Sequence, residues 1–230
     1  MKLPAPLFAG TLLRRYKRFL TDIERPDGTI ITAHTPNTGS MKQCAVPGYP
    51  VLFSVATNPK RKLPWTLELI RVGTDWVDTH TQRSNQLVAE ALAQGWITEF
   101  RDYQVRAEYA FGGSRIDFLL TKGNEKVLLE VKNVTLCCSA ETACFPDAVT
   151  LRGQKHLLEL QEAKHQGYRS VIFFLVQRSE AQFFSPADEI DPEYGRLLRQ
   201  VAATGVEVLA YKTHTTPEEN RVDEKIAVRL

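Results

Sequence analysis

The chain has 230 residues, of which 43% are hydrophobic and 24% charged, a composition typical of a globular protein of one or two domains. The N-terminal stretch MKLPAPLFAG contains two prolines and no long apolar run, which excludes a signal peptide. The strongest apolar run, VIFFLV at 171–176, is too short to span a bilayer. We therefore expect a cytoplasmic protein without a membrane partner.

The net charge of +2 conceals an uneven distribution of charge along the chain. The first 80 residues hold 11 Lys and Arg against 6 Asp and Glu, and the remaining 150 hold 18 against 21. Basic residues mixed with Tyr16, Phe19 and Trp65 favour contact with the phosphates and bases of nucleic acid, although a solvated strand face and loop would show the same pattern. The candidate nucleic-acid-binding residues here are Arg14, Arg15, Lys17, Arg18, Lys60, Arg61 and Lys62.

Residues 7–78 consist of short strand-like runs separated by turn signals. The runs are LFAGTLLRRYKRFLTDIE, TIITAHT, YPVLFSVAT and WTLELIRV. About five strands in so short a segment, without helical periodicity between them, predict a small closed barrel of the OB type. The pattern changes after Trp76, and we expect residues 1–80 to form this OB-like domain and residues 81–230 to form a second domain.

The second domain alternates helices and strands, which predicts a mixed sheet flanked by helices. We expect Ser84 to cap the first helix and Gly95 to end it, and Asp191-Pro192 to open the last helix. The expected elements are helices over 81–95 and 151–167, a helix after 191, and strands over 97–100, 103–111, 115–121, 126–134, 169–177 and 205–211.

The cysteines offer a weak case for a metal. Cys137, Cys138 and Cys144 with His156 could bind zinc, but the chain has no Cys-x-x-Cys pair, and adjacent cysteines rarely bind one ion well. Reduced, partly buried thiols are the favoured interpretation for these three and for Cys44.

Two charged strand segments carry the strongest chemical signal. The chain has three acid-x-lysine tripeptides, and those starting at Glu162 and Asp223 fall in polar stretches. Glu130-Val131-Lys132 instead lies late in an apolar strand, where the period of two places Glu130 and Lys132 on one face. A turn over 122–125 makes the preceding strand an antiparallel neighbour and brings Asp117 opposite Glu130.

Two carboxylates directly opposed on a sheet repel each other, and a divalent cation is the simplest compensation. Such a site suits Mg²⁺ or Mn²⁺ held by Asp117 and Glu130, with Glu90 in the preceding helix completing it. Lys132 would then orient a water molecule or stabilise charge on a phosphate. On spacing alone, a surface pair neutralised by the lysine remains an equal alternative.

This arrangement resembles the PD-(D/E)xK nuclease superfamily, although Ile116 replaces the proline of the motif's name. Across the whole chain, the sequence is similar to the sugar fermentation stimulation protein A (SfsA) family. The segments that carry this similarity are HTPNTGSM at 34–41, SRIDFLL at 114–120, LLEVKNVTL at 128–136 and FPDAVTLRGQKHLLEL at 145–160.

The resemblance implies an OB-like domain joined to a restriction-endonuclease-like domain. It also implies DNA binding without strong sequence preference and a link to the regulation of sugar (maltose) metabolism. The superfamily's metal-binding acids fall on Asp117 and Glu130, its lysine on Lys132 and its helical acid on Glu90. Arg152 and Lys155 open a helix beside this site and would bind phosphate.

Three functions from different classes stay open at this point. The first is a Mg²⁺-dependent nuclease, and the second is a non-catalytic regulatory DNA-binding protein on a nuclease scaffold. RNA is a possible partner in either, and the oligomeric state is open. The third, carbohydrate binding by the barrel, is disfavoured because basic residues outnumber aromatic ones there. His34 and His80 are expected to be structural or exposed, and the PNTGSM segment to be a structural turn, with phosphate binding by its N–H and hydroxyl groups as the alternative.

Overall fold

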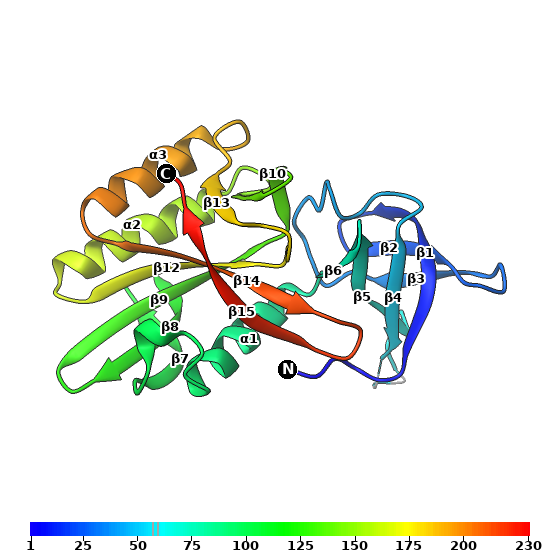
Figure 1. Ribbon diagram of the computed structural model, residues 1–230, viewed down its shortest axis with the longest axis horizontal. Coiled ribbons are helices and arrows are strands. Elements are labelled where there is room, and N and C mark those ends of the chain that lie inside the picture. The colour runs from blue at the N-terminus through cyan, green and yellow to red at the C-terminus, as the bar shows by residue number, and fades with distance from the viewer. Residues whose placement is uncertain (57, 59) are drawn as a thin grey trace.

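The chain folds into two parts that lie side by side (Figure 1), described by a computed structural model for residues 1–56, 58 and 60–230. The first part is a β-barrel, and the second is a large sheet with helices on both faces. No helix of the described residues is long and apolar enough to cross a membrane.

The barrel is closed by pairing between its third and fifth strands. β1 pairs with β2 and β4, β2 with β3, and β4 with β5, and a parallel contact between β3 and β5 completes the ring. This order is that of an OB-type barrel, and β6 adds to it as a hairpin partner of β5. The strands are β1 (Leu7–Tyr16), β2 (Leu20–Glu24), β3 (Ile30–His34), β4 (Pro50–Val55), β5 (Trp65–Val72) and β6 (Asp75–Asp78).

Side chains that alternate along these strands fill the barrel. Leu12, Ile23, Val51, Phe53 and Leu67 are all fully buried in one apolar cluster, as the period of two requires. The barrel therefore has its own core and does not borrow one from the second part.

Helix α1 (Thr81–Ala93) follows the barrel and begins at the start of the expected range, before the expected cap residue. The expected cap, Ser84, lies inside the helix and donates its hydroxyl to Asn133. The N-cap is His80, and the N–H of Thr81 is bonded to the carbonyl of Pro36. Packing against the barrel loop thus decides where the helix starts.

The segment over 97–100 is a 3₁₀ helix (Thr98–Phe100) and not the expected strand. Ile97 and Phe100 are both buried, and a spacing of three residues puts both on the inner side of a 3₁₀ turn. The same two apolar residues on a strand would point to opposite faces.

The second part is built on a mixed sheet, whose order over the described residues is β10-β11-β13-β15-β14-β12-β9-β8-β7. Helices α2 (Leu151–His165) and α3 (Pro192–Ala203) cover one face, and α1 covers the other (Figure 1). The strands are β7 (Gln104–Phe111), β8 (Ser114–Lys122), β9 (Glu125–Val134), β10 (Leu136–Ser139), β11 (Thr142–Phe145), β12 (Arg169–Val176), β13 (Phe183–Pro186), β14 (Glu207–Thr215) and β15 (Asn220–Val228).

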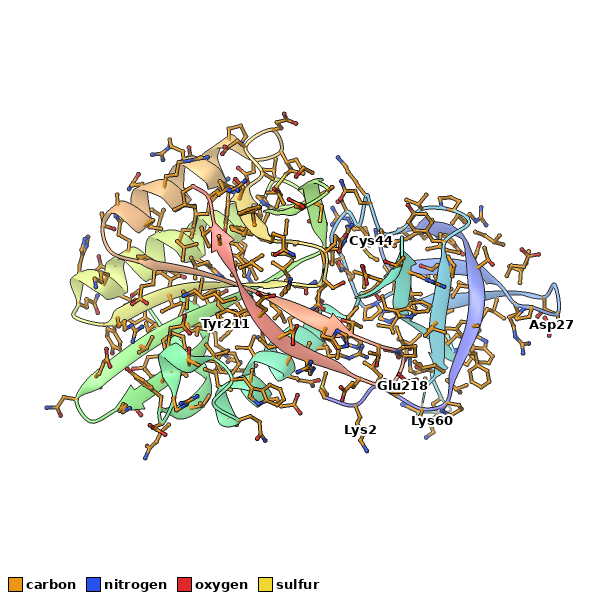
Figure 2. The ribbon with its side chains drawn as sticks, viewed as in Figure 1. Lys2, Asp27, Cys44, Lys60, Tyr211 and Glu218 are labelled. Atoms are coloured by element: carbon orange, nitrogen blue, oxygen red, sulfur yellow. A yellow bond between two sulfur atoms is a disulfide. The ribbon has the colours of Figure 1, made fainter. Side chains whose placement is uncertain are left out.

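The two parts meet through the loop between β3 and β4. Gln43 exchanges two hydrogen bonds with the backbone of Cys137, at 2.6 and 2.7 Å, and the thiol of Cys44 donates to the carbonyl of Thr135. Figure 2 shows Cys44 at this junction. These contacts fix the barrel against the edge of the large sheet.

The cysteines are not all reduced, which corrects the expectation from sequence. Cys138 and Cys144 form a disulfide between neighbouring strands β10 and β11. Cys44 and Cys137 are free and buried, and burial raises the pKa of each thiol to about 11. The described part of the chain contains no group of three or more His, Cys, Asp and Glu side chains that could hold a metal ion.

Candidate active site

The β8–β9 hairpin places the two predicted carboxylates beside each other. Its register pairs Lys122 with Glu125 and Phe118 with Leu129, so the next position along brings Asp117 to Glu130, as the turn at 122–125 predicts. The backbone ladder stops at this point. The N–H of Val131 donates to Asp117 Oδ2 at 2.8 Å, and the N–H of Asp117 lies 3.4 Å from Glu130 Oε2.

Side chains therefore replace the ladder bonds where the two strands separate. Backbone N–H groups inside a protein require acceptors, and here the acceptors are the carboxylates themselves. These hydrogen bonds fix Asp117 and Glu130 in place at the point where the pairing of β8 and β9 ends.

Glu130 and Lys132 point to the same face of β9, toward helix α2. Lys132 Nζ donates to Glu130 Oε1 at 2.8 Å and lies 3.1 Å from His156 Nδ1, which also contacts Glu130 Oε1. Glu130 is only 3% exposed and His156 only 3%. The predicted acid-x-lysine pair is thus a compact buried cluster, with a histidine as a third member.

The two carboxylates respond to this environment in opposite directions. Burial, followed by the negative charge of Glu130, raises the pKa of Asp117. Burial also acts to raise the pKa of Glu130, but hydrogen bonds and charge from His156 and Lys132 outweigh it and hold that pKa below its usual value. Asp117 therefore carries the uncompensated part of the negative charge.

Glu90 does not join the cluster, which corrects its expected place in the metal site. Its carboxylate forms an ion pair with the amine of Met1 at 2.7 Å. Asn85 of the same helix reaches Asp117 instead, donating Nδ2 to Oδ1 at 2.7 Å. Five residues further on, Glu90 is turned by about 140° around the helix axis and faces elsewhere.

Two further predicted residues, Arg152 and Lys155, lie beside the cluster. Arg152 Nε lies 3.4 Å from His156 Nε2, and Lys155 donates to the carbonyl of Gly113 at 3.1 Å while pairing with Glu159. Both line a surface pocket of about 460 Å³ that also borders His156. The start of α2 thus brings two exposed cations next to Glu130 and Lys132.

The basic residues of β1 and its turn divide into two groups. Lys17 and Arg18 are exposed at the tip of the β1–β2 hairpin, with φ of 48° and 65°. Arg14 is exposed but pairs with Asp22 at 2.8 Å. Arg15 is half-buried and donates to the carbonyls of Arg18, Asn37, Gly39 and Ser40, and burial lowers its pKa.

Arg15 therefore holds the barrel's own loops together, because its donors are directed to backbone carbonyls and not to solvent. This differs from the nucleic-acid-binding role expected for it. Lys60 and Lys62 are exposed, Lys60 visibly so in Figure 2, and Arg61 donates to Thr66 Oγ1 at 3.1 Å.

Comparison with known proteins identifies the chain. Residues 82–219 match a family model described as the sugar fermentation stimulation protein RE domain, and residues 13–78 match the SfsA N-terminal OB domain. The chain belongs to the SfsA family. The predicted family is therefore confirmed, and the two matches cover both parts of the fold.

Relatives within the SfsA family align over the whole chain. The sugar fermentation stimulation protein homolog of Syntrophotalea carbinolica is 59% identical over 230 residues, and that of Geobacter metallireducens is 52% identical over 233, each with 100% of both chains covered. The structure of Pyrococcus furiosus SfsA in complex with Ca²⁺ matches with a TM-score of 0.89 at 25% identity over all of both chains. This confirms the predicted fold class, an OB domain followed by a mixed α/β domain.

Sequence reasoning missed His156 and Asn85 as members of this SfsA site. The sequence places His156 at the start of a helix beside the site, as a basic or exposed residue or a zinc ligand, whereas it lies on the buried stripe of α2 with Leu157 and Leu160 and contacts Glu130. A histidine on an apolar helix stripe is the signal that could have found it. Asn85 offered no signal, because its role depends on how α1 packs against β8.

Proposed function

We propose that this SfsA-family protein binds nucleic acid, foremost DNA and with little sequence preference, and hydrolyses phosphodiester bonds at Asp117, Glu130 and Lys132. The observation that carries the proposal is the cluster of side chains where the pairing of β8 and β9 ends. There two carboxylates and a lysine converge, and the cations at the start of α2 lie next to them.

The donor set fits a hard divalent cation. Asp117 and Glu130 offer carboxylate oxygens, and the pKa of Asp117 is raised first by burial and then by the negative charge of Glu130, a charge that a cation would offset. Mg²⁺ is usually held by one or two acids, with waters and substrate phosphates completing its shell, so a third acid is not required. Pyrococcus furiosus SfsA was solved with Ca²⁺, which shares this preference for oxygen ligands.

Bound there, Mg²⁺ or Mn²⁺ would polarise a phosphodiester and lower the pKa of a water molecule. Residues of the chain would stabilise charge, position the carboxylate and bind phosphate. Lys132 donates hydrogen bonds beside Glu130 and would stabilise charge that builds on the phosphate. His156 fixes the position of Glu130, and Arg152 would bind a neighbouring phosphate.

Nucleic acid would be held by exposed cations in both domains. Lys17, Arg18, Lys60 and Lys62 are exposed on the barrel, and Arg152 is exposed at the start of α2. Contacts of this kind go to phosphates and carry no sequence information, so affinity should fall steeply as salt rises.

A second candidate is a DNA-binding regulator without catalysis, linked to sugar (maltose) metabolism. The observation that favours it is the charge balance around Glu130. Lys132 and His156 already contact the same carboxylate oxygen, so this acid is satisfied within the chain. In this case Asp117, Glu130 and Lys132 would be a retained scaffold that stabilises the domain.

Cleavage by a matched pair of variants separates the two candidates. Glu130→Gln keeps the size of the side chain but removes its charge, and should lower Mg²⁺-dependent cleavage of labelled DNA or RNA by about 100-fold or more. Glu162→Gln is the control, because Glu162 begins another acid-x-lysine tripeptide but is exposed on α2. Cleavage is measured on single- and double-stranded substrates with Mg²⁺, Mn²⁺ or EDTA.

Thermal unfolding of each variant shows that the fold is retained, and a salt titration of DNA binding is run in parallel. Cleavage that is equal in both variants belongs to a contaminant and contradicts catalysis here. Binding without cleavage in the parent protein supports the second candidate.

A further inference from the structure

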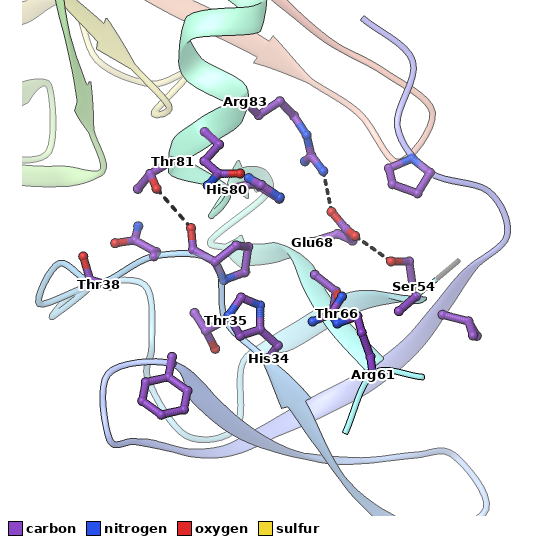
Figure 3. Close-up of a pocket in the computed structure, with 17 residues that line it drawn as sticks. His34, Thr35, Thr38, Ser54, Arg61, Thr66, Glu68, His80, Thr81 and Arg83 are labelled. Carbon is purple, nitrogen blue, oxygen red and sulfur yellow. Dashed lines mark hydrogen bonds and ion pairs between the residues drawn. The ribbon is translucent and has the colours of Figure 1, made fainter. Parts of the chain in front are cut away.

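A polar pocket of about 560 Å³ lies between the barrel and the start of α1, apart from the acid cluster (Figure 3). Its walls come from the end of β3, from β4 and β5, and from the first turn of α1. Volumes of this size suit a small organic ligand or one unit of a polymer. None of its lining residues belongs to the cluster of Asp117, Glu130 and Lys132.

The pocket walls are fixed before any ligand arrives. The hydroxyl and the N–H of Thr81 both donate to the carbonyl of Pro36, which ties α1 to the loop after β3. Glu68 accepts from Ser54 on one oxygen and from Arg83 on the other, as Figure 3 shows. The acid of the pocket is therefore satisfied, and its charge is balanced by Arg83.

Two histidines from different elements line the pocket, His34 at the end of β3 and His80 at the N-cap of α1. Burial, followed by the charge of a nearby arginine, lowers the pKa of each. Both rings are neutral at pH 7, and a neutral imidazole offers one donor and one acceptor. The Nδ1 atom of His80 has no hydrogen-bond partner among the described residues.

The remaining groups suit a phosphate and an aromatic base. Arg61 lines the pocket, bonds to Thr66 and forms no ion pair with any residue that the structure describes. Phe19, 46% exposed at the pocket wall, offers a flat apolar surface on which a base can stack.

Helix α1 borders both this pocket and the candidate active site. Asn37 and Thr81 also line a smaller pocket of about 120 Å³, which Asn133 of β9 lines as well. On α1, Thr81 at the pocket and Asn85 at Asp117 are one turn apart, about 6 Å along the helix axis. The helix that borders the pocket therefore also holds Asp117 in place.

We propose that this pocket holds one unpaired nucleotide of a nucleic-acid strand, with its base on Phe19, its polar edge at His34 and His80, and its phosphate at Arg61. This rests on the proposed nucleic-acid function and narrows its substrate to single-stranded or frayed ends. The strand would then continue along the first turns of α1 toward Asp117. A sugar ligand would use the polar edges but would have no need of Arg61.

Fluorescence anisotropy with a labelled short oligothymidylate and with a blunt duplex tests this. Phe19→Ala should weaken binding of the single strand by about fivefold or more and change duplex binding little. Arg61→Ala should weaken single-strand binding and flatten its salt dependence. The controls are Trp96→Ala, an aromatic residue 43% exposed in the second domain, and Lys126→Ala, an exposed cation at the start of β9.

The outcomes distinguish failure of the nucleotide pocket from failure of the proposed nucleic-acid function. Parent-like single-strand affinity in both pocket variants, with duplex binding intact, overturns the nucleotide pocket and leaves the proposed function standing. Absence of any nucleic-acid binding by the parent protein overturns the proposed function itself. If maltose, and not the oligothymidylate, shifts the NMR signals of His34 and His80, the pocket is a sugar site and the nucleotide proposal is wrong.

Discussion

Asp117 and Glu130 are neighbours on adjacent strands, yet only one of them is compensated. Glu130 has Lys132 and His156 as charged or polar partners, whereas Asp117 accepts hydrogen bonds from the neutral groups of Asn85 and Val131. An uncompensated, largely buried carboxylate lowers the stability of the fold when it ionises. Such a cost is typical of a residue kept for binding or chemistry.

Replacing Asp117 with Asn should stabilise the protein at neutral pH. The pKa of Asp117 is raised in the folded state above its ordinary value of 3.8, so the folded state binds the proton more tightly than the unfolded state. The free energy of unfolding therefore falls as pH rises from 3.8 through the raised pKa, and the loss is complete above that raised pKa. The melting temperature of Asp117→Asn should exceed that of the parent at pH 7.

The same comparison below pH 3.8, where Asp117 is protonated in both states, should show no advantage for the variant. Millimolar Mg²⁺ should raise the melting temperature of the parent but not that of Asp117→Asn. A variant that is less stable than the parent at pH 7 would contradict this account of the charge.

At the scale of elements, helix α2 carries the residues that complete the site. Its first two turns present Arg152, Lys155 and His156 to the end of β9. The helix start is fixed by Thr150, whose hydroxyl accepts the N–H of Gly153 at 3.0 Å. A Cβ added at Gly153 would lie 2.7 Å from Thr150 Cγ2, so the cap and the first turn are closely packed.

Loss of this cap should loosen the helix start. Thr150→Ala should lower the free energy of unfolding by about 1 kcal/mol, or roughly 2–4 °C in melting temperature, because the N–H of Gly153 loses its acceptor. Thr150→Ser is the matched control, since its hydroxyl can accept the same hydrogen bond. Urea unfolding of the three proteins measures the difference, and equal losses in Ala and Ser would show that the methyl group matters more than the cap.

Sequence patterns predicted elements whose bonding is local. The β8–β9 hairpin and its register followed from a turn at 122–125, and α3 followed from Asp191 capping before a proline. Among the strands that were missed, β15 forms a local hairpin with β14, but it lies in a polar stretch without apolar alternation. β13 pairs in parallel with the distant strands β11 and β15, and such partners cannot be seen in a local pattern.

The candidate site was predictable where its residues share one hairpin and not where they come from separate helices. Asp117, Glu130 and Lys132 lie on one hairpin, so the period of two and the turn were sufficient to bring them together. His156 and Asn85 come from helices whose rotation against the sheet is set by packing. Arg15 was misread because its acceptors include the carbonyl of Ser40, 25 residues away, and only the folded loop brings it close.

For the whole molecule, buried charges join the two domains. Arg83 of α1 donates to Glu68 of β5 and to Asp78 of β6, and the side chain of Asn220 in β15 donates to Asp78 at 3.0 Å. Each of these side chains is less than 10% exposed. The domains are thus held by a polar network that spans the barrel, the linking helix and the last strand.

Breaking this network should destabilise the protein strongly. Arg83→Met leaves Glu68 and Asp78 buried without their cation, which should cost about 3–5 kcal/mol of unfolding free energy. Arg196→Met removes an arginine from an exposed pair with Glu193 and should change stability little. Urea unfolding followed by circular dichroism compares them, and a small effect for Arg83→Met would show that water reaches the junction.

The burial of this network has a practical consequence for handling the protein. Dissolved ions weaken attraction between exposed charges, such as those of Lys17 and Arg18 with a phosphate backbone, but barely reach charges enclosed by protein. A wash in concentrated sodium chloride should therefore strip adventitious nucleic acid during purification while the domains stay joined. Preparations made in this way would start the cleavage assays free of co-purified substrate.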